Sequence, residues 1–267
     1  MTAAQLKERL LPRGPLDLLI QFAILALAYV AWRYARGAVA GGMTEAFAHA
    51  RDLISIERSL GTLVEPDVQG WTLDSGWLSE FVRWGYANLH FKGSCLMLAA
   101  IFLGWRGSFG FVRNMVLAAM AISILCYAAF PTAPPRFMPE LGLDPSSAVT
   151  GNDPVISAPG DPLFNPFAAV PSMHVAFSML FAWSLALLVR PRPLKALFFA
   201  YPLLMTYVVV ASGNHFWLDA ALGAVVAGAS AGIALLAARL NSDWSFGTDA
   251  ERAPVAATEP EVEAAPA

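Results

Sequence analysis

The chain has 267 residues, of which 57% are hydrophobic and only 14% are charged, and its mean hydropathy is +0.54. Water-soluble domains carry about 25% charged residues, so this composition excludes an ordinary soluble protein and indicates one that is integral to a membrane. The net charge of −3 gives no indication of nucleic-acid binding. The predicted elements therefore begin with the long apolar segments.

Six apolar segments are candidates for membrane crossing, which takes about 20 residues of helix. They are predicted over about 16–34, 82–105, 111–130, 173–189, 194–211 and 216–240, and the fourth and fifth are short. The predicted fold class is all-α, a polytopic membrane protein built as a six-transmembrane-helix bundle. Residues 1–240 are predicted to form one membrane catalytic domain.

The basic residues of the short loops predict the orientation of the bundle, because such residues gather on the cytoplasmic side. With six spans, one side receives Lys7, Arg9, Arg13, Arg106, Arg113, Arg190, Arg192, Lys195 and Arg239. That side is predicted to be the cytoplasm, with both termini on it, in a plasma membrane. Four arginines then lie outside, against the rule: Arg33, Arg36, Arg51 and Arg58.

Three outer or terminal segments complete the chain. Residues 35–81 show helical periodicity, with Phe47, Ala50, Ile54, Glu57 and Leu60 near one face, and Gly61 is a predicted helix end. This predicts one or two short amphipathic helices on the outer leaflet. Residues 131–172 form a long loop without periodicity, predicted to be an outer active-site loop. Residues 241–267 are acidic and predicted to be a disordered cytosolic tail.

Two short strings place ionisable residues where a polar loop meets an apolar segment, both on the outer side. PSMH ends at His174, and GNHFWLD contains His215 and Asp219. An ionisable group in hydrocarbon costs roughly 2.5–3.5 kcal/mol or more, which usually has a functional reason. The spacing i, i+4 puts His215 and Asp219 on one helix face, where the carboxylate can hold the imidazole in one tautomer. These three residues are predicted to share one site.

These strings, together with FPTAPPR at 130–136, resemble the type 2 phosphatidic acid phosphatase superfamily. ERSLG at 57–61 and YANLH at 86–90 are similar to its inositol-phosphotransferase branch, typified by fungal inositol phosphorylceramide synthase. The resemblance covers roughly residues 45–235. It implies an enzyme that acts on a phospholipid or polyprenyl phosphate and passes the group to water or to an acceptor alcohol, with no metal or other cofactor.

The resemblance also implies residue roles. His215 would attack phosphorus and form a phosphohistidine, Asp219 would orient it, and His174 would protonate the leaving oxygen. The implied phosphate-binding residues are Arg136, Ser172 and Asn214. Further candidate contacts from the branch strings and their surroundings are Glu57, Arg58, Tyr86, His90 and Lys92.

The chain departs from the superfamily pattern in ways that bear on the substrate. Met173 stands where PSGH has glycine, the lysine six residues before Arg136 is missing, and GNHFWLD lacks an arginine. Two cations of the usual phosphate cradle are therefore missing, which fits a phosphodiester. The residues left to compensate are Arg136 and Asn214, with Arg83, Lys92 and Arg58 as further candidates. Two alternatives stay open: a simple phosphatase of phosphatidic acid or polyprenyl pyrophosphate, and a non-catalytic lipid transporter or lipid-binding protein.

Several of these residues also have a purely structural interpretation. Arg136 is also explained as an interfacial anchor, and Asn214 as the cap of the last helix. Glu57 and Arg58 are equally explained as a local surface pair of little energetic value. His90 is as well explained by hydrogen bonding within the bundle as by ligand contact.

Overall fold

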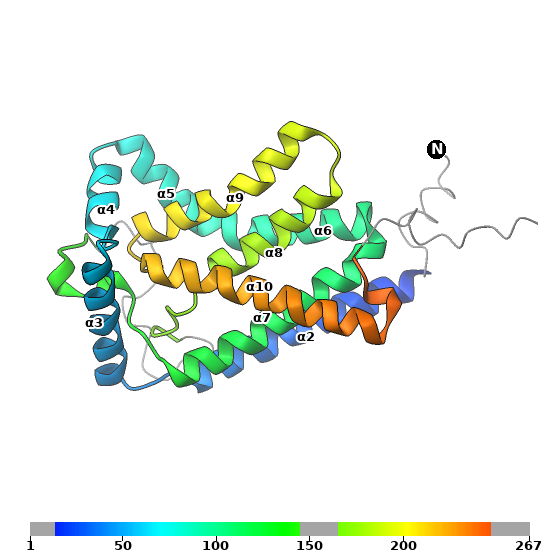
Figure 1. The fold of residues 1–267 in the computed structure, drawn as a ribbon, viewed down its shortest axis with the longest axis horizontal. Helices are drawn as coiled ribbons and strands as arrows, with labels where there is room; N and C mark the ends of the chain where they lie inside the picture. The colour runs from blue at the N-terminus through cyan, green and yellow to red at the C-terminus, as the bar shows by residue number, and fades with distance from the viewer. Residues whose placement is uncertain (1–13, 145–164, 247–267) are drawn as a thin grey trace, which may run out of the picture.

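The computed structural model describes residues 14–144 and 165–246, and every regular element in these ranges is helical (Figure 1). The longer helices in chain order are α2 (Gly14–Ala38), α3 (Met43–Leu60), α4 (Glu65–Leu73), α5 (Gly76–Asn88), α6 (Ser94–Gly104), α7 (Arg106–Ala129), α8 (Met173–Leu188), α9 (Arg192–Ala211) and α10 (Trp217–Leu240). The short turns are η1 (Leu89–Gly93), η2 (Pro135–Phe137), η3 (Pro139–Leu141) and η5 (Ser242–Trp244).

Five helical segments are long and apolar enough to cross a membrane, so the chain is a polytopic membrane bundle. They are Gly14–Ala38, Gly76–Gly104, Arg106–Ala129, Arg192–Ala211 and Trp217–Leu240. These correspond to the first, second, third, fifth and sixth predicted spans. The predicted fourth span is the apolar helix α8, which has only 16 residues.

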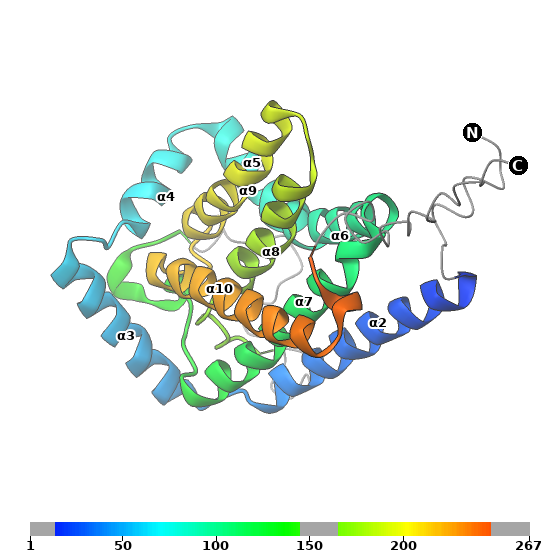
Figure 2. The same cartoon turned by 45° about the vertical axis from the view of Figure 1, so that its right-hand side comes forward.

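Helix α8 lies at the centre of the bundle, and most of its residues are buried (Figure 2). It packs against α6, α7, α9 and α10. Its alanines Ala176, Ala182 and Ala186 are fully buried, which lets neighbouring helices approach closely. The start of α8 is therefore enclosed by the other helices.

The second span is one continuous helical segment interrupted by the π-turn η1. The hydroxyl of Tyr201 donates a hydrogen bond of 2.7 Å to the carbonyl oxygen of Leu89. A Cβ atom at Gly93 would collide with the same hydroxyl. A side chain inserted into a helix is a recognised cause of such a bulge, and π-bulges are frequent at functional sites. The bulge sets the position of His90.

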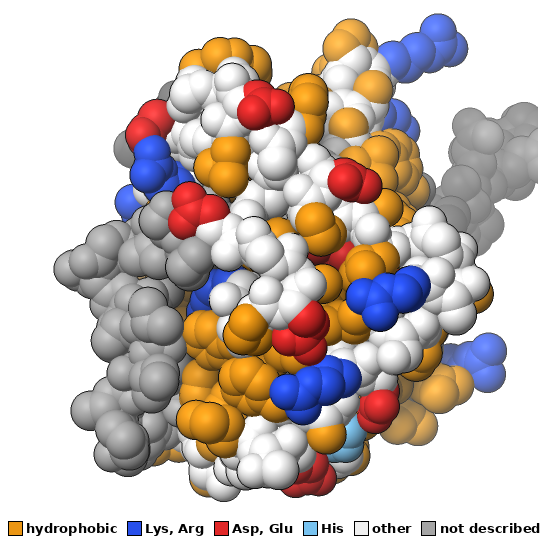
Figure 3. Space-filling view, turned by 90° about the vertical axis from the view of Figure 1, so that its left-hand side faces the viewer, with side chains coloured by type: hydrophobic (Ala, Val, Ile, Leu, Met, Phe, Trp, Pro, Cys, Tyr) orange, Lys and Arg blue, Asp and Glu red, His pale blue; other side chains and the backbone are white. Residues whose placement is uncertain are grey.

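Helices α3 and α4 lie across one end of the bundle (Figure 1), so the predicted outer segment consists of two short helices. Figure 3 shows this end, where charged side chains are scattered among hydrophobic ones. The prediction that Gly61 ends the first helix is confirmed, since Gly61 adopts the left-handed conformation with φ of 67°. Of the residues predicted near one face of this helix, Ala50, Ile54 and Glu57 are buried, whereas Leu60 is 62% exposed.

The described parts of the 131–172 loop pack beneath α3. The amide of Thr132 donates to the carbonyl of Phe167, and the amide of Ala133 donates to the carbonyl of Ala46. Residues 145–164 of this loop lie outside the described residues. So do residues 1–13 and residues 247–267, which hold most of the predicted tail. At the start of that tail, η5 packs on α7 and α10.

Candidate active site

The turn between α9 and α10 positions His215. The carbonyl oxygen of Val209 accepts hydrogen bonds from the amides of Asn214 and His215, at 3.1 and 3.2 Å. Gly213 has φ of 67°, a left-handed conformation that favours glycine. The chain thereby reverses within a few residues, and it delivers the His215 side chain, which is 5% exposed, to the interior.

Asp219 lies on the first turn of α10 and holds His215. Its Oδ2 atom lies 3.2 Å from Nδ1 of His215 and also accepts the amide of Phe216 at 2.9 Å. A carboxylate at this distance places a proton on Nδ1, so Nε2 keeps its lone pair. The i, i+4 spacing therefore does bring the two side chains together, as predicted.

His174 is the second residue of α8, and Ser172 is the N-cap of that helix. The Nδ1 atom of His174 lies 3.1 Å from Nε2 of His215. Because Nε2 of His215 is the acceptor in this network, His174 is the donor. Asp219, His215 and His174 therefore form one chain of hydrogen bonds inside the protein.

Close backbone contact joins the two histidine strings. Gly223 lies one helical turn beyond Asp219 on α10, and a Cβ atom there would overlap the carbonyl oxygen of Ser172. Only a residue without a side chain fits this approach. The absence of a side chain at Gly223 thus lets α10 meet the PSMH turn, which sets the distance between His174 and His215.

The third string, FPTAPPR, abuts the same turn. The amide of Arg136 donates 2.9 Å to the carbonyl oxygen of Gly213, and its side chain is half-buried. Asn214 donates from its side chain to the Ser212 hydroxyl at 2.8 Å. Asn214 is therefore not the cap of α10, in contrast to the alternative considered from the sequence.

The nucleophile candidate is electrostatically tuned toward its neutral form. Burial lowers the pKa of His215 to about 3, and the positive charges of Arg136 and Arg36 act in the same direction. A neutral imidazole is the form that carries a nucleophilic lone pair. His215 is therefore ready to attack at neutral pH without first losing a proton.

Two carboxyl groups from the outer helices cap α10, the helix that carries Asp219. Oε1 of Glu65 accepts the amide of Trp217, and Oε1 of Glu57 accepts the amide of Leu218, each at 2.7 Å. Both glutamates are fully buried, whereas Arg58 is exposed. The surface-pair interpretation of Glu57 and Arg58 is therefore wrong, and neither residue lines the cavity described below.

The two capping carboxyl groups face each other. Burial raises the pKa of Glu57 to about 8, and the neighbouring Glu65 carboxyl raises it further; burial also raises the pKa of Glu65. Among the described residues, Oε2 of each group has no other hydrogen-bond donor within reach. One proton shared between Glu57 and Glu65 satisfies both atoms.

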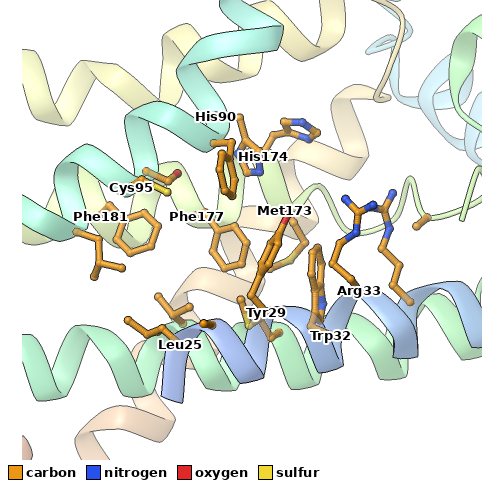
Figure 4. A pocket seen from close by; sticks show the side chains of 18 of the residues that line it. Leu25, Tyr29, Trp32, Arg33, His90, Cys95, Met173, His174, Phe177 and Phe181 are labelled. Atoms are coloured by element: carbon orange, nitrogen blue, oxygen red, sulfur yellow. The ribbon is translucent and has the colours of Figure 1, made fainter. Parts of the chain in front are cut away.

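A cavity of about 1010 Å³ leads from the histidines into the apolar part of the bundle. Figure 4 shows Tyr29, Trp32 and Arg33 projecting from α2, opposite Phe177 of α8. Phe22 of α2 and Phe91 of η1 also line it, and they are 70% and 53% exposed at the surface. The cavity therefore opens between α2 and the second span, toward the lipid.

The candidate contacts in and next to the YANLH string separate into two groups. Tyr86 and His90 line the cavity, with ring centroids 5.0 and 4.2 Å from that of His174. Nδ1 of His90 is buried and has no hydrogen-bond partner among the described residues. Lys92 is exposed and donates to Asn88 at 2.6 Å, outside the cavity. No cluster of three or more metal-binding side chains occurs in the described ranges.

Sequence reasoning missed two cavity residues and one helix cap. Arg33 and Arg36 of α2 line the cavity with His174, His215 and Arg136. Their signal was their conflict with the orientation predicted from the positive-inside rule, since ionisable residues within a membrane span often serve function. Glu65 carried no comparable signal, because its partner Trp217 lies far away in the sequence.

Comparison with known proteins gave one match. The family model described as the PAP2 superfamily matches residues 51–233, which is more than half of the chain. A search of curated proteins and a search of solved structures each found no match. The matched region contains Arg136, His174, His215 and Asp219, whereas α2 lies outside it.

Proposed function

Because the chain belongs to the PAP2 superfamily, we propose that it is a membrane enzyme that moves the phosphate group of a lipid through a phosphohistidine on His215. Membership indicates phosphatase or phosphotransferase activity on lipid phosphates. One observation carries the more specific proposal: the hydrogen-bonded chain from Asp219 through His215 to His174 stands at the end of an apolar cavity.

The first step uses both histidines. Nε2 of His215 attacks phosphorus in line, and the bond from phosphorus to the leaving ester oxygen breaks. His174 enters this step as an imidazolium, gives its Nδ1 proton to that oxygen and becomes neutral. The Asp219 carboxylate stabilises the positive charge that develops on the His215 ring. In the structure the two ring nitrogens are hydrogen-bonded to each other, so the phosphate must enter between them.

The second step releases the group. Water or an acceptor alcohol loses its proton to Nδ1 of His174 and attacks phosphorus, and the bond between phosphorus and Nε2 of His215 breaks. His215 returns to its neutral form and His174 to its protonated donor form. The same residues thus serve hydrolysis and transfer, and the outcome depends on which nucleophile reaches the phosphohistidine.

The cavity supports a lipid substrate. Its apolar lining from α2, α6, α7 and α8 can cover a hydrocarbon chain, and burial contributes about 0.8 kcal/mol for each methylene group. Its opening between α2 and the second span would admit the chain sideways from the bilayer. The polar groups stand at one end of the cavity, whereas transporters place such groups near the bilayer midplane.

We propose that the finer activity is transfer of a phosphodiester head group, of the inositol-phosphate type, to a lipid or sugar alcohol. The similarity of the ERSLG and YANLH strings to this branch supports the proposal. The orientation predicted from the basic residues would place the site on the outer side of a plasma membrane. Simple hydrolysis of phosphatidic acid or polyprenyl pyrophosphate is the alternative.

The test compares the purified full-length protein with its His215→Ala variant on a panel of phosphomonoester and phosphodiester lipids, with and without inositol and lipid alcohols. His49→Ala is the matched control, because His49 bonds to Pro131 and does not line the cavity. We expect mass spectrometry to show a product that depends on His215. A new phosphodiester would establish transfer, and inorganic phosphate alone would establish hydrolysis. Equal activity of His215→Ala would contradict the mechanism.

A further inference from the structure

Helix α2 brings two arginines to the site from outside the region that matches the family. Arg33 and Arg36 are three residues apart, so they lie on neighbouring positions of one helix face. Both line the cavity that contains His174 and His215. The matched region begins at residue 51, so these two cations are not part of the family pattern.

Arg36 is held in place by neutral groups rather than by a carboxylate. Its Nη2 atom donates to the carbonyl oxygen of Asn165 at 3.3 Å, and its guanidinium lies 5.8 Å from the Trp32 ring centroid. The Asn165 side chain, 1% exposed, donates in turn to the carbonyl oxygen of Arg36. Nε of Arg36 is buried without a hydrogen-bond partner in the described part of the chain.

The charge of Arg36 acts on the reacting groups. It lowers the pKa of His215 together with Arg136, although burial has the larger effect. Neither Arg33 nor Arg36 forms an ion pair with any residue in the described ranges. The guanidinium of Arg36 is half-buried, and its buried Nε–H group requires an anion or water, since leaving such a donor without a partner costs free energy.

We propose that Arg36, assisted by Arg33, binds the non-bridging oxygens of the phosphate that sits at His215. Helix α2 would thereby supply the two cations that the FPTAPPR and GNHFWLD strings lack. The planar guanidinium suits this role because its fork of N–H donors matches phosphate oxygens. The inference rests on the proposed function, since it concerns the same site.

The test measures the binding of orthovanadate, a phosphate analogue, to the full-length protein in detergent by calorimetry. We expect Arg36→Gln to weaken binding by about tenfold to a hundredfold, because charge-assisted hydrogen bonds to the anion are lost. Arg33→Gln is expected to have a smaller effect. Arg51→Gln is the matched control, because Arg51 is exposed on α3 and faces Glu140 at 3.5 Å; its affinity should stay within about twofold of the original.

A second variant separates binding from folding. Arg36→Lys keeps the charge without the fork, and we expect it to recover part of the affinity. The thermal unfolding midpoint of each variant, without vanadate, reports any purely structural role. Wild-type affinity in Arg36→Gln and Arg36→Lys would overturn this inference and leave the proposed function standing. A wild-type protein that neither binds vanadate nor turns over any lipid would overturn both.

Discussion

The main-chain carbonyl oxygen of Asp219 accepts a hydrogen bond of 3.0 Å from the amide of Ser172. One residue thus acts on both histidines, because its side chain holds His215 and its backbone holds the turn that carries His174. A shift of the first turn of α10 would therefore move both at once.

Replacing Asp219 by Asn should abolish most activity while leaving the fold intact. The amide oxygen can still accept from Phe216, but the negative charge beside His215 is lost. We expect turnover to fall by roughly two to four orders of magnitude, as in other carboxylate–imidazole pairs. Initial rates on the substrate identified by the lipid panel measure this. The control is Asp52→Asn, because Asp52 is an exposed residue of α3. A loss smaller than about threefold would remove Asp219 from the mechanism.

Adding one methyl group at Gly223 should disrupt the site. The new Cβ would overlap the Ser172 carbonyl, and overpacking of this kind costs about 1–3 kcal/mol. We expect Gly223→Ala to lower both the unfolding midpoint and turnover, because the PSMH turn must move away from α10. Gly228→Ala on the same helix is the matched control, since nothing lies within 4 Å of its Cβ position. Equal behaviour of the two variants would show that the contact does not matter.

The histidine pair could be predicted from the sequence because its signals are local. The i, i+4 spacing of His215 and Asp219 fixes their relation on any helix, and both strings stand at the end of an apolar run. The helices were found for the same reason, since hydrophobicity is read along the chain. The π-turn that positions His90 could not be found this way, because Tyr201 of another helix inserts into it.

The stability of the protein should depend on the Glu57 carboxyl between about pH 4.5 and 8. Folding raises the pKa of Glu57 from 4.5 to about 8. Between these two pH values the folded state therefore keeps a proton that the unfolded state has released. The stability that this carboxyl contributes is therefore fully present below pH 4.5 and is lost as the pH rises through 8. We expect the temperature of the unfolding midpoint of the wild type in detergent to decrease as the pH is raised from 7 to 9.

Glu57→Gln should flatten this dependence. Its amide oxygen can still accept from Leu218, and its amide group can donate to Glu65 at any pH. Between pH 7 and 9 an ordinary histidine is already mostly neutral, so His215 contributes little to the slope. Glu45→Gln, exposed on the same helix α3, is the control and should retain the wild-type slope. An equally steep fall for Glu57→Gln would refute the shared proton.

Filling the cavity should discriminate between lipids by chain length. Leu98 of α6 lines the cavity, and a tryptophan there would occupy space needed by the substrate. We expect Leu98→Trp to raise KM for a long-chain lipid by about tenfold, equivalent to the loss of one or two buried methylene groups. A short-chain analogue should be far less affected. Leu96→Trp is the matched control, because Leu96 is 72% exposed on the same helix; similar effects of both variants would contradict a role for the cavity.

The roles of the two capping carboxyl groups and of the α2 arginines could not be assigned from the sequence, because each role depends on a partner that is distant in the chain. Glu57 accepts a hydrogen bond from Leu218, which lies 161 residues further along the chain. Arg36 meets Asn165, which follows the part of the loop outside the described residues. In both cases the sequence suggests an exposed charged residue, but the packing of α2 and α3 on the bundle directs the side chains of Arg36 and Glu57 toward the interior.

The short length of α8 bears on how deep in the bilayer His174 lies. Its 16 residues span about 24 Å, compared with a hydrocarbon core of about 30 Å. If α8 stands upright with its Arg190 end at one interface, its His174 end would lie about 6 Å below the opposite one. Under the proposed mechanism, a lipid would then have to sink out of the headgroup plane to react, and the phosphohistidine would form where water is scarce. At that depth an alcohol dissolved in the bilayer would have an advantage over water as the nucleophile of the second step.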